Sequence, residues 1–399
     1  MFRIALPFAF IAFAVQAQTT AVPPALATIK QKLLDDIRRA PDYTCSELIE
    51  RKSRTAGSKS YDLLDRVRVE VSYVSGKELF AWRGGDPIAA DELPRLVLGT
   101  VSNGDFAMHP RVLLTNSRVQ FSEPAEANDP SSRRFNFRVP ASSSDWQLSV
   151  GGRDTQTAYH GFLDVVKDSG RLARIELIAD ALPAALGYTS IVKRLEYAGV
   201  RIGNSAALLP SSSELVTVAA DGQEIHSETH FADFRNPSPP VAPSAGAGSE
   251  LPDEINIELT LETPVDSDTS AVGDPIAARV HQTIKKKKDV VVPKGALLYG
   301  RISVLEMVQG FRIVDFVFTH FDVDGRIVDL RNRSNMLELE DRYTMGDKVL
   351  VNEKMGPMSG KNVSTVFTRA PGPIRMTTPR AKVPKGFKLY LRSTPRAAN

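Results

Sequence analysis

Val67-Arg68-Val69-Glu70-Val71-Ser72-Tyr73 decides the fold class, because apolar and polar residues alternate along it without interruption. A period of two places every apolar side chain of an extended strand on one face. The same alternation recurs at Phe135–Val139 and at Trp146–Val150. These segments predict β-strands that each bury one face.

Short turns separate the strand-like segments. They are Ser75-Gly76, Gly151-Gly152, Ser169-Gly170 and Asp221-Gly222. Glycine tolerates the positive φ angle that tight hairpin turns need, so these pairs predict antiparallel neighbours. The sequence therefore indicates a mainly β protein.

Helical patterns occur in two places. From Pro24 to Arg39, Leu26, Ile29, Leu33 and Ile37 share one face, which predicts an amphipathic helix. The segment 91–114 lacks a period of two and contains two prolines, so we expect two short helices there.

The first seventeen residues have the pattern of a signal peptide. Arg3 precedes an apolar run from Ile4 to Val15, and the small residues Val15 and Ala17 follow at a cleavage site. The alternative is an uncleaved anchor, but the apolar run is shorter than the ~20 residues that cross a bilayer. We expect cleavage after Ala17 and export to the periplasm or cell envelope.

Composition divides the remaining chain of this 399-residue protein. A helical segment at 18–42 precedes a β domain at 43–235. Prolines, then Ala, Gly and Ser, fill 236–250 and predict a linker, so we expect the flanking domains to fold independently. A second β domain follows at 251–399, with a long loop expected at 343–380.

One internal echo lies in the second domain. Val292-Pro293-Lys294-Gly295 recurs as Val383-Pro384-Lys385-Gly386, and a strand-like segment follows each copy. Pro and Gly suit the successive positions of a tight turn, so the echo predicts two similar turns that each start a barrel strand.

The charges and motifs exclude several classes of function. Fifty basic and forty-seven acidic residues nearly balance, which argues against a nucleic-acid binder. Phosphate loops, nucleophile elbows and paired-cysteine metal motifs are absent from the sequence. We therefore expect a non-enzymatic protein without catalytic residues or a cofactor.

Two acidic segments have some features of metal sites. Glu224, His226, Glu228 and His230 alternate on one strand face, but alternate side chains lie ~7 Å apart, too far for one ion to bind them all. Asp266, Asp268 and Asp274 lack the glycine and the distal glutamate of a calcium loop. We expect no metal ligand in either segment.

Lys285 to Lys288 form a run of four positive charges with two open interpretations. They form either a contact with anionic lipid headgroups or a solvated hairpin end that prevents strand pairing between molecules. The second interpretation is the default for such a run.

The residues 24–235 resemble the LolA/LolB lipoprotein-carrier family in the order of their elements. The resemblance also includes Gly161-Phe162-Leu163-Asp164-Val165, followed by Gly170-Arg171-Leu172. It implies a half-open antiparallel β-barrel with an N-terminal helix and short lid helices over an apolar cavity.

The residues 251–330 resemble the C-terminal β-barrel of TrbI-like conjugation and type IV secretion scaffolds. The segments that carry this resemblance are Leu261–Ser267, Val272–Ile276 and Val291–Gly295. It implies a second small β-barrel.

These observations favour an envelope protein that binds an acyl chain, a lipoprotein or an envelope partner in an apolar concave β face, with peripheral membrane contact as one mode of action. The alternative is a structural scaffold that acts through the second domain. The expected lining residues are Val67, Val69, Val71, Tyr73, Phe80, Trp82, Phe135 and Phe137.

Overall fold

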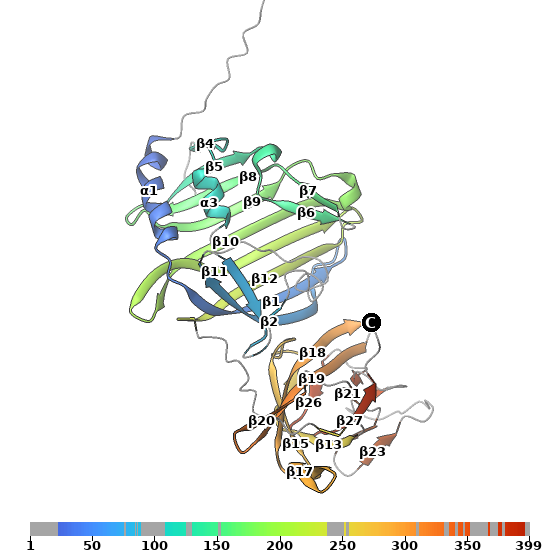
Figure 1. Cartoon of the computed structure of the whole chain (residues 1–399). Helices are drawn as coiled ribbons and strands as arrows, with labels where there is room; N and C mark the ends of the chain where they lie inside the picture. Colours follow the sequence, from blue (N-terminus) through green and yellow to red (C-terminus); the bar gives the residue numbers. More distant parts are fainter. Residues whose placement is uncertain are drawn as a thin grey trace, which may run out of the picture.

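The computed structural model contains two curled β-sheets and two helices among the residues that it describes (Figure 1). Those residues are 23–75, 77–83, 85, 87–88, 108–124, 130–150, 153–237, 251–252, 255–308, 311–330, 335–339, 342–345, 348–351, 366–367, 374–376 and 380–395. The expected signal peptide and most of the expected linker lie outside them. The mainly β fold class is confirmed.

Helix α1 (Pro24–Arg38) confirms the N-terminal helix. Pro24 suits the first turn of a helix, where its missing N–H costs nothing. Leu26, Leu33 and Leu34 are buried. The helix ends where the Arg39 N–H donates to the Asp35 carbonyl and the Ala40 N–H donates to the Ile37 carbonyl. The apolar stripe therefore holds α1 against the first sheet.

The first sheet contains ten strands in the order β3-β2-β1-β12-β11-β10-β9-β8-β5-β4. Its strands are β1 (Tyr43–Arg54), β2 (Asp62–Val74), β3 (Lys77–Ala81), β4 (Gln120–Ser122), β5 (Ser132–Val139), β8 (Tyr159–Val166), β9 (Leu172–Ala179), β10 (Tyr188–Ile202), β11 (Ser205–Ala219) and β12 (Glu224–Arg235). A separate hairpin joins β6 (Gln147–Val150) to β7 (Arg153–Gln156), and short 3-10 turns lie at Ala141–Ser143 and Ala184–Leu186. We call the elements from α1 to β12 the first unit.

The expected turns connect antiparallel strands. β2 pairs with β3, β6 with β7, β8 with β9, and β11 with β12. Gly170 and Gly222 both have positive φ angles, as the hairpin interpretation requires. The antiparallel prediction is confirmed.

Helix α3 (Met108–Thr115) corresponds to the second of the two short helices expected at 91–114. Pro110 lies inside its first turn, where proline is tolerated, so it does not break the helix. The first expected helix falls within 89–107, outside the described residues. Leu113 and Leu114 of α3 are buried with Leu33 of α1, so both helices cover the same apolar core.

The second sheet follows the order β23-β22-β27-β13-β15-β18-β19-β25-β24, with β20 beside β19 and β21 beside β27. Its strands are β13 (Asn256–Leu261), β15 (Pro275–Val280), β18 (Leu297–Val308), β19 (Phe311–Val323), β20 (Arg326–Asp329), β21 (Asn335–Leu339), β22 (Arg342–Met345), β23 (Lys348–Val351), β24 (Val366–Phe367), β25 (Ile374–Met376) and β27 (Lys388–Pro395). Two small sheets pair β14 (Val265–Asp266) with β26 (Lys382–Val383), and β16 (Ile284–Lys286) with β17 (Asp289–Val292). We call the elements from β13 to β27 the second unit.

The repeated Pro-Lys-Gly segments form the same turn twice. Gly295 and Gly386 have φ angles of 89° and 90°. The residue after each glycine donates its N–H to the proline carbonyl, over 3.2 Å in both copies. The turns feed β18 and β27, which confirms the prediction that each turn starts a strand.

The stretch 343–380 differs from the expected loop. It contains β23, β24 and β25 and most of β22, and Ile374 and Met376 are buried. The Gly, Pro, Met and Lys residues of this stretch interrupt any apolar-polar alternation, so the sequence gives no local signal for strands. These strands form because they pair with neighbouring strands.

The two units meet along a contact that we call the seam. Val272 extends the outer edge of β2, where its N–H donates to Arg66 O and its carbonyl accepts from the Arg68 N–H, both over 2.8 Å. Arg68 also forms an ion pair with Asp274. The Arg301 guanidinium lies 4.1 Å above the centre of the Trp82 ring. Backbone, charge and ring contacts thus join the units.

Candidate functional site

One face of the first sheet carries a continuous inner row of side chains. Following the register from β5 to β2, the row contains Phe135, Leu163, Ile175, Leu195, Ser213, Thr229, Ile49 and Val67. Apolar residues form both ends of this row and polar residues form its centre. The sheet therefore presents one largely apolar face to the helices.

The eight expected lining residues occupy different parts of the first unit. Val67, Val69, Val71 and Phe135 are at most 1% exposed, Trp82 and Phe137 are buried, and Tyr73 and Phe80 are half-buried. The three valines and Trp82 belong to an apolar cluster that continues into the second unit. Phe135 and Phe137 belong to a separate cluster with leucines of α1 and α3. The structure thus brings these residues together in two groups.

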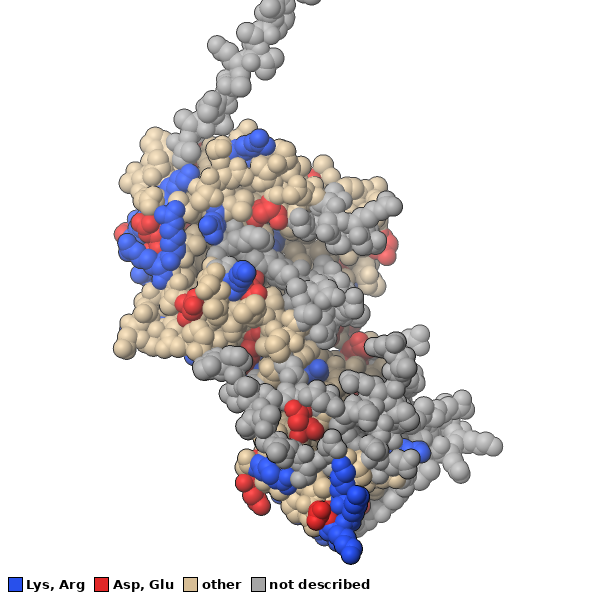
Figure 2. Space-filling view, in the orientation of Figure 1, with Lys and Arg blue, Asp and Glu red and all other residues tan. Residues whose placement is uncertain are grey.

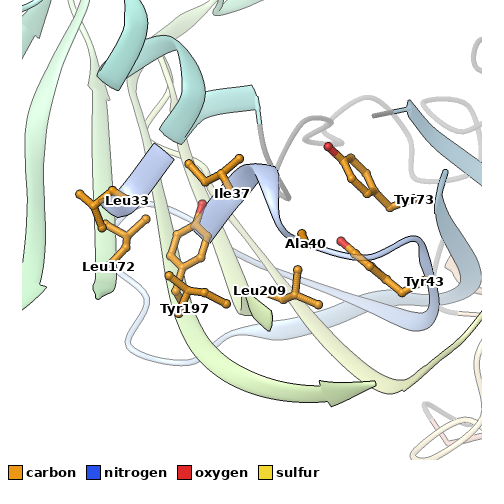
Figure 3. A pocket seen from close by; sticks show the side chains of 9 residues that line it. Leu33, Ile37, Ala40, Tyr43, Tyr73, Leu172, Tyr197 and Leu209 are labelled. Carbon is orange, nitrogen blue, oxygen red and sulfur yellow. The ribbon is translucent and has the colours of Figure 1, made fainter. Parts of the chain in front are cut away.

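A pocket lies between α1 and the sheet (Figure 3), and we call it the α1 pocket. Its empty volume is about 420 Å³, including the part open to solvent. Its side chains are apolar or aromatic and belong to Leu33, Ile37, Ala40, Tyr43, Tyr73, Leu172, Tyr197, Leu208 and Leu209. They leave room for little more than a water molecule, so a larger ligand needs α1 to move away from the sheet.

Tyr43 and Tyr73 form one wall of the α1 pocket, opposite Leu33 and Leu172 (Figure 3). Their rings stack with centroids 5.6 Å apart, as the direct pairing of these residues on β1 and β2 allows. Burial raises the pKa of both hydroxyls, so the tyrosines stay neutral at physiological pH. The wall offers flat apolar surface with polar tips.

Only Tyr73 of the expected lining residues faces this pocket. Leu33 and Ile37 lie on the helix face that the sequence shows as apolar, so a signal for them existed. No local pattern links them to Tyr197 or Leu209, because the fold brings these segments together from distant positions.

A second arrangement missed from the sequence is a buried polar chain beneath α3. Lys193 Nζ lies 3.1 Å from His109 Nε2, and His109 Nδ1 lies 2.9 Å from Asp145 Oδ2. The Tyr159 hydroxyl donates to the other oxygen of Asp145. Because Lys193 is 1% exposed and His109 2% exposed, this chain anchors α3 to β10 and is closed to solvent.

Asp145 keeps its negative charge although it is largely buried. Burial acts to raise the pKa of this carboxyl, but the hydrogen bonds from His109 and Tyr159 and the attraction of His109 outweigh it. The net pKa lies below its usual value, so Asp145 is ionised at neutral pH.

The thiol of Cys45 is buried on the inner face, opposite Val71. Burial, followed by the nearby charge of Glu47, raises its pKa. The thiol is therefore protonated at neutral pH and lacks the thiolate form that reacts.

The outer face of the first sheet carries a ladder of alternating charges. Arg194 of β10 forms ion pairs with Glu176 and Glu214 at 2.7 Å each, and Glu214 also approaches His226 Nε2 at 2.6 Å. The ladder reaches β1 through Arg54, which pairs with Glu224. These partners occupy Glu224 and His226, the first two members of the alternating Glu and His segment.

The aspartates of the second unit also have cationic partners. Asp266 lies 3.1 Å from Lys382 Nζ, Asp268 lies 3.4 Å from Arg380, and Asp274 pairs with Arg68 across the seam. Over the part of the chain that the structure describes, no three His, Cys, Asp or Glu side chains are placed to share a metal ion.

Comparisons with known proteins identify one similar solved structure. It is a LolA superfamily protein from Nitrosomonas europaea, with 12% sequence identity and a TM-score of 0.26, and the match covers 53% of this chain and 94% of that chain. At these values the match supports no statement about function. No family model and no curated protein matches the chain, so the TrbI-like resemblance of 251–330 rests on sequence motifs alone.

The length and composition of the helices bear on membrane insertion. Within the described residues, no helix is both long enough and apolar enough to cross a bilayer.

Proposed function

We propose that the first unit is a non-enzymatic carrier or receptor module that binds an acyl chain, free or attached to a lipoprotein, between α1 and the inner face of the sheet. The observation that carries the proposal is the α1 pocket, where a single helix covers an apolar and aromatic surface. The closed pocket holds little more than a water molecule, so the proposal requires α1 to move away from the sheet when an acyl chain binds.

The inner face extends this surface beyond the pocket. When α1 moves outward, Leu33 and Ile37 expose the apolar core that includes Phe135 and Leu195. Each buried methylene contributes ~0.8 kcal/mol, so a chain of about ten methylenes gains roughly 8 kcal/mol before the cost of moving the helix. Of the eight residues expected from the sequence, Tyr73, Phe135 and Phe137 are the proposed lining of the opened face, because Tyr73 faces the pocket and the two phenylalanines lie in the core beneath the helices.

Export to the periplasm or cell envelope is part of the same proposal. It rests on the leader-like residues 1–17, and an acyl-binding module needs a compartment in which it meets lipids.

Displacement of a fluorescent fatty-acyl probe tests this function. Ala40→Phe, just beyond the end of α1, fills the α1 pocket and should weaken probe binding at least tenfold, whereas Ala27→Phe on the exposed side of α1 is the control. Affinity should also increase with the chain length of unlabelled competitors. Equal binding by the two variants, or no probe binding by the wild type, contradicts the proposal.

A second candidate is a structural scaffold of an envelope assembly that acts through the second unit. The seam favours it, because an apolar cluster shared by both units fixes how the second unit is presented. This candidate predicts that an envelope partner crosslinks to the second unit of the full chain when acyl-probe binding is absent.

A further inference from the structure

The hairpin formed by Ile284–Val292, which we call the lysine hairpin, is anchored at its base. Ile284, Val291 and Val292 are buried in the core of the second unit. Arg326 Nη2 also donates to the Val291 carbonyl over 3.0 Å. The hairpin therefore projects from a fixed position.

The far end of the lysine hairpin is charged and exposed. Lys287 and Lys288 form the turn, and Lys285 lies directly opposite Val290 on the paired strands. In Figure 1 this hairpin forms the end of the second unit farthest from the first unit, and Figure 2 shows a group of basic side chains at that end. The lysines therefore lie at one exposed end of the molecule.

Three of these lysines have no counterion within the described structure. The side chains of Lys285, Lys287 and Lys288 form no ion pair or hydrogen bond with the described residues, and Asp289 is the single acidic residue of the hairpin. Most other basic side chains discussed above have acidic partners. The positive potential at the turn is therefore not compensated within the described structure and can attract an anion from outside the protein.

Val290 adds an apolar contact beside these charges. It is 51% exposed, one of few large apolar side chains so exposed among the described residues. Lysines that protect a sheet edge lie along the edge strand, but here the turn itself carries the charges and the hairpin forms its own two-stranded sheet. Cationic groups around an exposed aliphatic side chain suit the interface of a lipid bilayer.

We propose that the lysine hairpin docks the protein on a bilayer surface that contains anionic phospholipids. Lys285, Lys287 and Lys288 contact the headgroups, and Val290 enters the boundary with the acyl chains. This contact is made by the second unit and does not depend on ligand binding at the α1 pocket.

The charge pattern sets the size of the effect. A lysine close to an anionic membrane contributes about a fivefold increase in affinity, so neutralising three lysines should weaken binding on the order of 100-fold. Raising the salt concentration shortens the Debye length and should release the protein.

The experiment is co-sedimentation of the full chain with phosphatidylcholine vesicles, with and without phosphatidylglycerol. The test variant is Lys285→Gln, Lys287→Gln, Lys288→Gln. The control variant Lys30→Gln, Lys59→Gln, Lys77→Gln removes the same net charge from the first unit. Val290→Ser tests the apolar contact, and a thermal melt of each variant verifies folding.

The proposal predicts salt-sensitive binding to vesicles that contain phosphatidylglycerol, an approximately 100-fold loss in the hairpin variant, a several-fold loss in Val290→Ser and little change in the control. Binding that is equal on both vesicle types, equal losses in the two triple variants, or no binding to anionic vesicles overturns it. In the last case an acidic protein partner becomes the better match for the hairpin. The acyl-probe assay uses no vesicles, so failure of either proposal leaves the other open.

Discussion

Replacement of Gly273 by alanine should separate the two units. Gly273 has a φ angle of 94°, and a Cβ atom there lies 2.2 Å from the Arg68 carbonyl oxygen and 2.8 Å from the Trp82 ring. Arg68 cannot move away, because β1 pairs with β2 on its other edge. The loop that contains Val272 and Gly273 must therefore move instead.

The magnitude follows from the contacts that this movement breaks. Two backbone hydrogen bonds contribute roughly 1 kcal/mol each, and the Arg68–Asp274 pair and the Arg301–Trp82 contact about 0.5–1 kcal/mol each. Their loss totals about 3–4 kcal/mol, which shifts the equilibrium between joined and separated units by a few hundredfold.

The assay uses a protease site inserted at 243–248, followed by gel filtration of the cleaved protein. Wild-type fragments should elute together at micromolar concentration, and Gly273→Ala fragments should elute apart. Gly295→Ala is the matched control, because Gly295 has a φ angle of 89° but no atom within 4 Å of the place that an alanine Cβ would take. Co-elution of folded Gly273→Ala fragments would refute the assignment of the seam to this contact.

Three further changes test the first unit. Asp145→Asn should lower the free energy of unfolding by about 2 kcal/mol at pH 7. Because folding depresses the pKa of this carboxyl, its stabilising contribution is complete above the unfolded pKa of about 3.9 and is lost as the pH falls through the folded pKa. The stability difference between wild type and variant should therefore be smaller at pH 3 than at pH 7 in denaturant titrations, and an equal difference contradicts a stabilising role for the charge. Gly161→Ala places Cβ 1.8 Å from Glu176 O and should cost at least about 3 kcal/mol, whereas Gly199→Ala meets only the end of an arginine side chain and should melt near the wild-type temperature. Leu195→Ala should lower the free energy of unfolding by about 2–5 kcal/mol in urea, and a loss below 1 kcal/mol means that the inner face is already open to water.

The sequence was sufficient wherever a structural element has a local pattern. Alternation predicted β2 and β5, the apolar stripe predicted α1, and glycine pairs predicted the hairpins. Each of these signals arises from side-chain direction within one segment, which needs no knowledge of the partner.

The candidate site was less predictable because it depends on which segments meet. The polar chain joins His109, Asp145 and Lys193, none of which is near another in sequence. The seam depends on Val272 reaching the edge of β2, a contact that no local pattern in either segment predicts. Strand β25 has no alternating pattern long enough to detect, yet its buried ends pack inside the second unit.

The pairing of first and last strands sets the order in which the protein can fold during synthesis. β1 pairs with β12, and β13 pairs with β27. In each sheet, one edge of an early strand therefore stays unpaired until a much later strand has been synthesised. Such distant pairings fold slowly, since long loops must close before contacts form. The ribosome must release residue 235 before the first sheet can be completed. β13 can pair early with β15, but its other edge stays open until residues near 395 have been made. Hairpins between consecutive strands can therefore form early, while the closing pair of each sheet is made last.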